Sequence, residues 1–217
     1  MSDDAREALV AACRHLADRG LSPGGSGNVS VRSGSRLLIT PTGSSLSRVE
    51  PADLAVVPVD PAAPPAGDPG GRPVPSKELP LHRAVYAARP SATAVVHLHS
   101  PAAVAASCLE PAAPPRETAT GPLPAVTPYQ VMRLGDLPVA PYALPGSAEL
   151  ATGVAALAAD APALLLANHG SVVAGVHLAG ALDLAEELEA AAQVVLLLAG
   201  VPHRRLTAAQ VAALRTR

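Results

Sequence analysis

The stretch APALLLANHGSVVAGVHLAGAL, residues 161–182, decides between a membrane span and a folded sheet. It contains no Asp, Glu, Lys or Arg, and its length is close to the ~20 residues that cross a bilayer as a helix. However, Pro162 opens the stretch, and the polar triplet NHG at 168–170 interrupts it. Two short strands around a polar turn, at 164–167 and 171–174, explain this pattern better than one helix.

The remainder of the chain mixes strand-like and helix-like segments. Strands are predicted at 29–31, 37–39, 54–59 and 94–98, and helices at 4–19 and 179–199, with further helices starting at Ser76 and Ser100. The strands outnumber those that a simple alternation of strand and helix needs. We therefore predict an α/β fold with a central, mostly antiparallel sheet and helices packed on it.

Two helix predictions carry more detail. Ser76 is the expected N-cap of its helix, because Pro80 then falls in the first turn, where the missing N–H costs little. The helix at 179–199 is expected to bury an apolar stripe and to expose an acidic face that includes Glu189. Segments rich in proline and glycine, 60–75 and 110–125, are expected to be loops.

Composition excludes several function classes. Hydrophobic residues make up 49% of the 217 residues and charged residues 16%, so the chain can bury a core. The net charge is −2 and aromatic residues make up only 1%, so neither a basic footprint nor a stacking platform for nucleic acid is expected. The N-terminus has no apolar signal region, and Cys13 and Cys108 match no paired motif, which predicts a cytoplasmic protein with free thiols and no membrane contact.

Three histidines and one glutamate form the strongest chemical signal. His97 and His99 end an apolar strand, and residues two apart on a strand point to the same face, roughly 6 to 7 Å apart at Cα. His169, in the polar turn, is a candidate third ligand, which makes the pattern of a catalytic metal site with one open position. Glu78 is either a fourth ligand or a general acid/base, and His82, one helical turn later, is a candidate supporting partner. Each of these residues also has a plain structural explanation when it is considered alone.

Three segments could bind a phosphate group. Gly27-Asn28 follows a turn rich in glycine and serine and has free backbone N–H groups. The segment TPTGSS at 40–45, which contains Thr42 and Gly43, offers hydroxyls and N–H groups together, and Ser76-Lys77 is expected at a helix N-terminus. The glycine-rich P-loop motif is absent.

These motifs, in this order, resemble the class II aldolase family of L-fuculose-1-phosphate aldolase and L-ribulose-5-phosphate 4-epimerase. The matching pieces are GNVSVR at 27–32, ITPTG at 39–43, PSKE at 75–78, HLH at 97–99 and NHG at 168–170. The resemblance implies one α/β/α three-layer domain over residues 1–217, usually assembled as a C4 homotetramer. It further implies one Zn²⁺ per subunit, with Mn²⁺ or Co²⁺ as alternatives.

The resemblance also implies roles for individual residues. His97, His99 and His169 would hold the zinc, and Glu78 would act as acid/base. Phosphate would be bound by the residues Gly27, Asn28, Thr42, Gly43 and Ser76. Tyr129 looks like the tyrosine that reaches the active site from a neighbouring subunit, whereas the further C-terminal tyrosine of the aldolases has no match.

One subgroup of the family fits more closely. The aldolases carry Ser-Ser-Glu where this chain has Ser76-Lys77-Glu78, and that string looks like the 3-oxo-tetronate 4-phosphate decarboxylases. These enzymes convert a four-carbon keto acid phosphate into dihydroxyacetone phosphate and CO₂, which implies zinc-dependent decarboxylation through a metal-stabilised enediolate. Lys77 would bind either the phosphate or the substrate carboxylate. The alternatives are a sugar-phosphate aldolase or epimerase on the same fold, and a non-catalytic interaction module.

Overall fold

A seven-stranded sheet organises the chain in the computed structural model, which describes residues 1–63, 73–109, 119–120 and 122–216. The strand order is β3-β2-β1-β4-β9-β8-β7, and every neighbouring pair is antiparallel except β7 and β8. The strands are β1 (Asn28–Ser33), β2 (Arg36–Ile39), β3 (Ala55–Pro58), β4 (Ala94–Leu98), β7 (Val139–Ala140), β8 (Ala163–Leu166) and β9 (Gly170–Gly175). The predicted mostly antiparallel α/β fold is confirmed.

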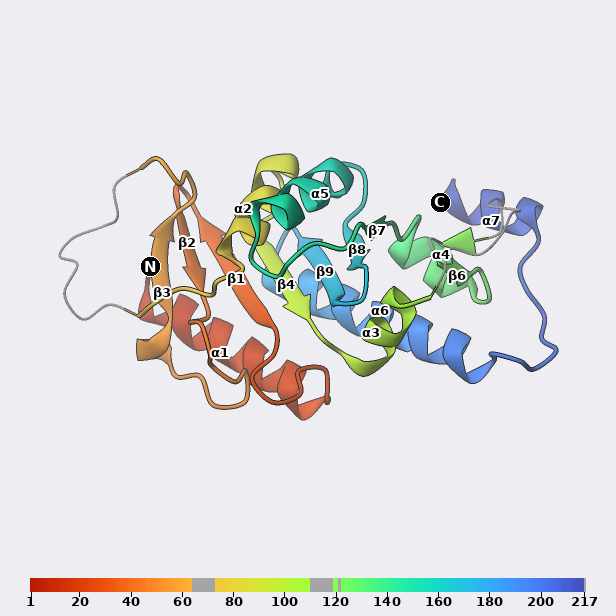
Figure 1. The fold of residues 1–217 in the computed structure, drawn as a ribbon, viewed down its shortest axis with the longest axis horizontal. Helices are drawn as coiled ribbons and strands as arrows, with labels where there is room; N and C mark the ends of the chain where they lie inside the picture. Colours follow the sequence, from red (N-terminus) through yellow and green to blue (C-terminus); the bar gives the residue numbers. More distant parts are fainter. Residues whose placement is uncertain (64–72, 110–118, 121, 217) are drawn as a thin grey trace.

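Helices cover both faces of this sheet, which gives three layers (Figure 1). On one face lie α1 (Asp3–Asp18), α3 (Pro101–Ser107) and α6 (Leu178–Leu197), and on the other lie α2 (Leu79–Ala88) and α5 (Ala148–Ala158). The short helices α4 (Pro128–Leu134) and α7 (Ala208–Arg215) pack against each other beside the far end of α6. A one-turn helix, η1 (Pro51–Asp53), precedes β3.

The central strand β4 shows how the sequence separates the two layers. Val96 and Leu98 pack into the core shared with α1 and α6, whereas Val95 packs into the core shared with α2 and α5. Because side chains alternate along a strand, His97 shares the face of Val95. The strand therefore brings a histidine to the side of the sheet on which α2 begins.

The hairpin predicted within 161–182 is confirmed, because β8 and β9 pair antiparallel around the polar turn. Within the part of the chain that the structure describes, none of the helices has the length and apolarity needed to cross a bilayer. Cys13 and Cys108 are both free, the first buried and the second exposed.

The predicted start of the second helix is wrong. The helix begins at Leu79, its N-cap position is Glu78, and Pro80 is the second helical residue. The Ser76 hydroxyl accepts a hydrogen bond from the Glu78 backbone N–H at 3.2 Å, so it forms a local turn ahead of the helix instead of capping it.

Several other segments differ from the sequence-based expectations. Within the supposed loop at 110–125, β5 (Ala119–Thr120) and β6 (Leu123–Pro124) pair as a two-stranded ribbon, while 110–118 and 121 lie outside the described residues, as do 64–72 of the other expected loop. The helices α4, α5 and α7 and the strand β7 were not predicted. Glu189 is buried, not exposed on the acidic face of α6.

Candidate metal centre and anion pocket

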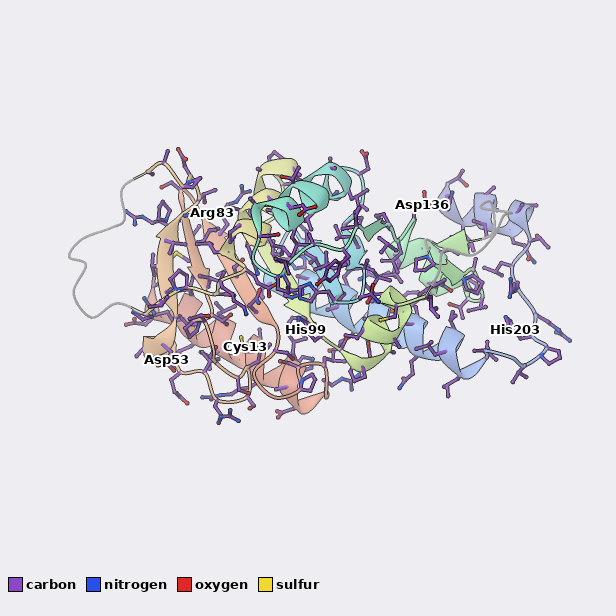
Figure 2. All side chains as sticks on the ribbon, viewed as in Figure 1. Cys13, Asp53, Arg83, His99, Asp136 and His203 are labelled. Carbon is purple, nitrogen blue, oxygen red and sulfur yellow. The ribbon has the colours of Figure 1, made fainter. Side chains whose placement is uncertain are left out.

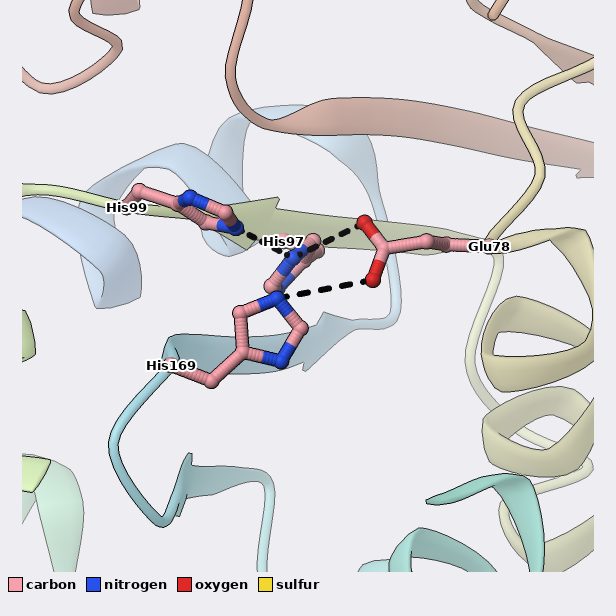
Figure 3. Close-up of side chains that lie close together, drawn as sticks. All are labelled: Glu78, His97, His99 and His169. Atoms are coloured by element: carbon pink, nitrogen blue, oxygen red, sulfur yellow. Dashed lines mark hydrogen bonds and ion pairs between the residues drawn. The ribbon is translucent and has the colours of Figure 1, made fainter. Parts of the chain in front are cut away.

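Four side chains converge near the middle of the molecule, where β4 ends (Figures 2 and 3). His97 comes from β4, His99 from the residue just after it, His169 from the turn between β8 and β9, and Glu78 from the N-cap of α2. One ligand atom from each of the four residues lies within 4.8 Å of the others. Three separate chain segments therefore supply one compact set of nitrogen and oxygen donors.

The local backbone explains why the turn reaches this position. Asn168 adopts a left-handed conformation with φ of 56°, which asparagine tolerates better than most residues. A Cβ atom on Gly170 would lie 2.3 Å from the Leu98 carbonyl oxygen, so only glycine allows this close approach to β4. The sequence Asn168-His169-Gly170 therefore presses the turn against the strand that carries the other two histidines.

The contacts around His97 indicate that a cation belongs in the cluster. Its Nδ1 lies 2.8 Å from the Ser171 carbonyl oxygen, which only accepts, so Nδ1 carries a proton and Nε2 is the nitrogen that faces the cluster. That Nε2 faces Glu78 Oε2 and His99 Nε2, each at 3.1 Å. Electron-rich atoms this close need a shared proton or a positive ion between them.

Unpartnered atoms point to the same conclusion. Both ring nitrogens of His169 and the Oε1 atom of Glu78 are buried without a hydrogen-bond partner among the described residues, although Oε1 lies 3.5 Å from His169 Nε2. Buried polar atoms normally have partners, and three imidazoles with a carboxylate are ligands that divalent transition metals accept. The residues present therefore fit a divalent metal ion.

Electrostatics keep Glu78, His99 and His169 in the protonation states that metals bind. Burial lowers the pKa of His99 to about 4, and His97 and His169 lower it further against the opposing Glu78 carboxylate. Burial likewise lowers the pKa of His169. Burial alone would raise the pKa of the Glu78 carboxyl, but the hydrogen bond and charge of His97, aided by Asn28 and His169, hold it far below its usual range. These shifts favour the neutral form of His99 and His169 and the ionised form of Glu78.

A pocket of about 520 Å³ opens onto this cluster and collects the anion-binding candidates. Its lining includes every one of the predicted phosphate-binding residues, namely Gly27, Asn28, Thr42, Gly43, Ser76 and Lys77, together with Glu78, His99 and His169. The structure thus brings all three predicted anion-binding segments beside the histidines. The Asn28 side chain already makes two hydrogen bonds, from its Nδ2 to Glu78 and at its Oδ1 with His82.

Tyr129 lies elsewhere in this chain. It sits on α4, its side chain is 53% exposed, and it is not among the residues that line the pocket. The nearby Arg133 guanidinium lies 6.0 Å from the centre of its ring.

Several supporting contacts were not apparent from the sequence. The Ser107 hydroxyl accepts a hydrogen bond from the His169 backbone N–H at 3.2 Å, and Pro145 adds to the pocket wall. The His82 side chain, a predicted supporting partner of Glu78, bonds Asn28 and not the Glu78 carboxylate. Only helical spacing hinted at His82, and no sequence signal marked the others.

A family comparison matches this arrangement. The model of the class II aldolase and adducin N-terminal domain matches residues 7–196, which include all four cluster residues. The chain belongs to this family. The resemblance inferred from the motifs is thereby confirmed, and class II aldolases are among the solved structures with the same fold.

Relatives within the class II aldolase family include decarboxylases and aldolases. A 3-oxo-tetronate 4-phosphate decarboxylase from Haemophilus influenzae is 41% identical over 213 residues, 98% of this chain and 96% of the relative. The crystal structure of YgbL from Escherichia coli has a TM-score of 0.86 at 38% identity and covers 98% of each chain. An L-fuculose 1-phosphate aldolase has a TM-score of 0.84 at 27% identity, over 100% of this chain and 96% of that one.

Proposed function

We propose that this chain is a 3-oxo-tetronate 4-phosphate decarboxylase that releases CO₂ and dihydroxyacetone phosphate. The family and the relatives at about 40% identity together make the chain a metal-dependent carbon–carbon lyase, and the printed activity of those relatives supports this particular reaction. The observation that carries the proposal is the cluster of three histidines and Glu78, part of which lines a pocket together with Lys77, glycines and residues that carry hydroxyl groups. We place the enzyme in the cytoplasm and treat residues 1–217 as one domain.

The metal that we propose is zinc, held by His97, His99 and His169 with Glu78 beside them. A divalent cation at this position would supply a positive charge that stabilises the electron pair left on the substrate when a bond to C2 breaks. The Ser171 carbonyl oxygen would orient the His97 ring, as outer hydrogen bonds commonly do for ligating histidines.

Substrate binding is assigned to the rest of the pocket. Phosphate would contact the backbone around Gly27 and Gly43 and the hydroxyls of Thr42 and Ser76, all of which line the pocket. For Asn28, the remaining amide N–H is the available donor, since the other contacts of the amide are already made. Lys77 would then bind the second anion of the substrate, its carboxylate.

The reaction needs one proton for each CO₂ released. The bond between C2 and the carboxylate breaks, its electron pair remains on the substrate as an enediolate, and C2 then takes up a proton. Glu78 is the proposed donor, because it borders the pocket. Because its lowered pKa keeps Glu78 ionised, the carboxylate must first take up a proton from water in the pocket, and Tyr129 of a second chain is the alternative donor.

The direct test supplies purified protein and zinc with 3-oxo-tetronate 4-phosphate, and measures CO₂ and dihydroxyacetone phosphate. L-Fuculose 1-phosphate, with aldehyde as the product, is the parallel substrate. We expect CO₂ release, and Glu78→Gln should lower kcat by about 10²–10⁴-fold while retaining most of the zinc. Aldehyde release from the sugar phosphate without CO₂ release from the keto acid would replace the decarboxylase with the aldolase alternative.

A further inference from the structure

A buried chain of hydrogen bonds leads from Glu78 into the core, away from the pocket. Glu78 Oε2 accepts from Asn28 Nδ2 at 2.9 Å, and Asn28 Oδ1 lies 2.5 Å from His82 Nε2. The other ring nitrogen, His82 Nδ1, lies 2.7 Å from Ser30 Oγ, which in turn lies 2.9 Å from the Tyr86 hydroxyl. The chain thus joins a candidate metal ligand to groups that no substrate can reach.

Side chains from α2 and β1 alternate along this series of hydrogen bonds. Glu78, His82 and Tyr86 follow one another at four-residue spacing from the N-cap along α2, which puts them on one helix face. Asn28 and Ser30 are two apart on β1, which puts them on one sheet face. Asn28 pairs with His97 between β1 and β4, and this pairing places the series of hydrogen bonds beside the histidine cluster.

The direction of each hydrogen bond follows from chemistry. An ionised carboxylate only accepts, so the NH₂ group of Asn28 must face Glu78 and its Oδ1 must face His82. His82 must therefore donate from Nε2, and its Nδ1 must accept from the Ser30 hydroxyl. His82 is completely buried, and this burial lowers its pKa to about 3, so the ring has a single N–H to offer.

We propose that His82 is a positioning residue for the metal centre, because its Nε2–H holds the Asn28 amide in the orientation that donates to Glu78. With Oε2 held this way, Oε1 stays directed toward His169 Nε2, 3.5 Å away. Without the imidazole donor, the buried Asn28 Oδ1 would lose its partner, and an amide turned over would place its oxygen against the carboxylate. The proposal rests on the proposed function only for the role of the cluster as a metal site.

The experiment measures binding of cobalt(II) alone, by the visible absorption of the bound ion, in the wild-type protein and three variants. His82→Leu removes the donor, and His82→Gln restores an N–H donor at nearly the same reach. Tyr86→Phe is the matched control, since it cuts the same chain at its far end. We expect His82→Leu to weaken cobalt binding by about 10–100-fold, while His82→Gln and Tyr86→Phe stay within about threefold of the wild type.

Three results of the cobalt experiment would overturn the proposal. If Tyr86→Phe weakens cobalt binding as much as His82→Leu does, the buried hydrogen bonds only stabilise the packing of α2 on β1. If His82→Leu binds cobalt as tightly as the wild type, with an unchanged absorption spectrum, His82 is not required to orient the Asn28 amide. A wild-type protein that takes up no cobalt also overturns it.

A second measurement needs no variant and so covers a failure of His82→Leu to fold. The ¹⁵N–¹H spectrum of the histidine rings should show His82 as the Nε2–H tautomer, and the Nδ1–H tautomer would refute the proposed orientation. Neither readout requires substrate. A protein with the expected cobalt pattern that releases no CO₂ would refute the decarboxylase proposal and leave the role of His82 intact.

Discussion

Each histidine of the cluster is held by a different backbone device, so the three are expected to contribute separately to metal binding. His97 is fixed by its bond to the Ser171 carbonyl oxygen, His99 follows the end of β4, and His169 depends on the turn that Gly170 allows. None of the three rings belongs to either hydrophobic core. Loss of one imidazole should therefore leave the fold in place.

The first prediction concerns these ligands. His97→Ala, His99→Ala and His169→Ala should each lower zinc occupancy, measured by elemental analysis after gel filtration, and should abolish turnover. Circular dichroism should show the wild-type helix content in all three. A variant that retains full zinc and activity would remove that histidine from the ligand set.

Lys77 is the residue that distinguishes the proposed decarboxylase activity from the alternative aldolase activity. It lines the pocket beside Glu78, and its backbone carbonyl oxygen would lie 2.9 Å from a Cβ on Gly146, so the neighbouring loop packs closely against it. A keto acid phosphate carries one more anionic group than a ketose phosphate. A cation in this position suits that additional charge.

The second prediction is therefore a change in selectivity. Lys77→Ser should lower kcat/KM for the keto acid phosphate by about 10- to 100-fold, the size of a charge-assisted hydrogen bond of roughly 1.5–3 kcal/mol. A ketose phosphate should be affected little. Equal losses for both substrates would assign Lys77 to the shared phosphate, and no loss for either would leave it as a surface charge.

At the level of helices, α3 depends on a side chain from another helix. The carboxylate of Glu189, on α6, accepts hydrogen bonds from the backbone N–H groups of Ala102 and Ala103 at 2.9 and 2.8 Å. Ser100, the N-cap residue, makes no capping bond with its side chain. Glu189 therefore supplies the acceptor that the first turn of α3 lacks, and its negative charge also suits the helix N-terminus.

The third prediction follows from this contact. Glu189→Ala should lower the free energy of unfolding by about 1.5–3 kcal/mol, because two buried N–H groups lose a charged acceptor. Asp183→Ala, at an exposed position of the same helix, should change it by less than about 0.5 kcal/mol. Urea denaturation measures both, and equal effects would show that Glu189 acts only as a general helix charge.

The buried histidines should make the stability of the whole molecule depend on pH. Burial lowers the pKa of His82 to about 3, whereas an unfolded histidine titrates near 6.5. Below pH 6.5 the unfolded chain therefore binds a proton that the folded chain refuses, so stability falls as the pH drops from about 6.5 toward 3.

The fourth prediction isolates this effect. With a chelator present to exclude bound metal, the free energy of unfolding should fall between pH 6 and pH 4. In His82→Gln, whose amide does not titrate, the slope should be smaller by up to about 1.4 kcal/mol per pH unit. Identical slopes, measured by denaturant unfolding, would mean that His82 is not held neutral by the fold.

At the scale of the whole molecule, we also propose an oligomeric state. Tyr129 is exposed and does not line the pocket of its own chain. Tyr142 and Leu144, which are 60% and 67% exposed, lie just before Pro145, which lines that pocket. Exposed apolar side chains beside a site are typical of surfaces that another chain covers. We propose a symmetric homotetramer in which Tyr129 completes the site of a neighbour.

The fifth prediction tests this assembly in two ways. Light scattering at micromolar concentration should give a tetramer, and a fully active monomer would contradict it. Glu78→Gln and Tyr129→Phe should each be nearly inactive alone, yet refolded mixtures should regain activity at about a quarter of the sites by random pairing of chains. No recovery would place Tyr129 in the site of its own chain.

The sequence alone predicted those features that depend on neighbours along the chain. His97 and His99 share a face because strand side chains repeat every two residues, and Asn168-His169-Gly170 marked a tight turn by its residue types. The antiparallel hairpin at 161–182 followed from the same local patterns. The ordered motifs of the family then indicated which segments would meet.

Tertiary structure alone decided the contacts that join distant segments. Glu78 is the N-cap residue of α2, while Ser76 forms a turn ahead of the helix, and the buried Glu189 carboxylate accepts hydrogen bonds from the first turn of α3. The chain from Glu78 through Asn28 to His82 exists only because β1 pairs with β4 while α2 packs across them. Such contacts depend on the relative placement of whole elements, which hydrophobic packing sets and which no local periodicity records.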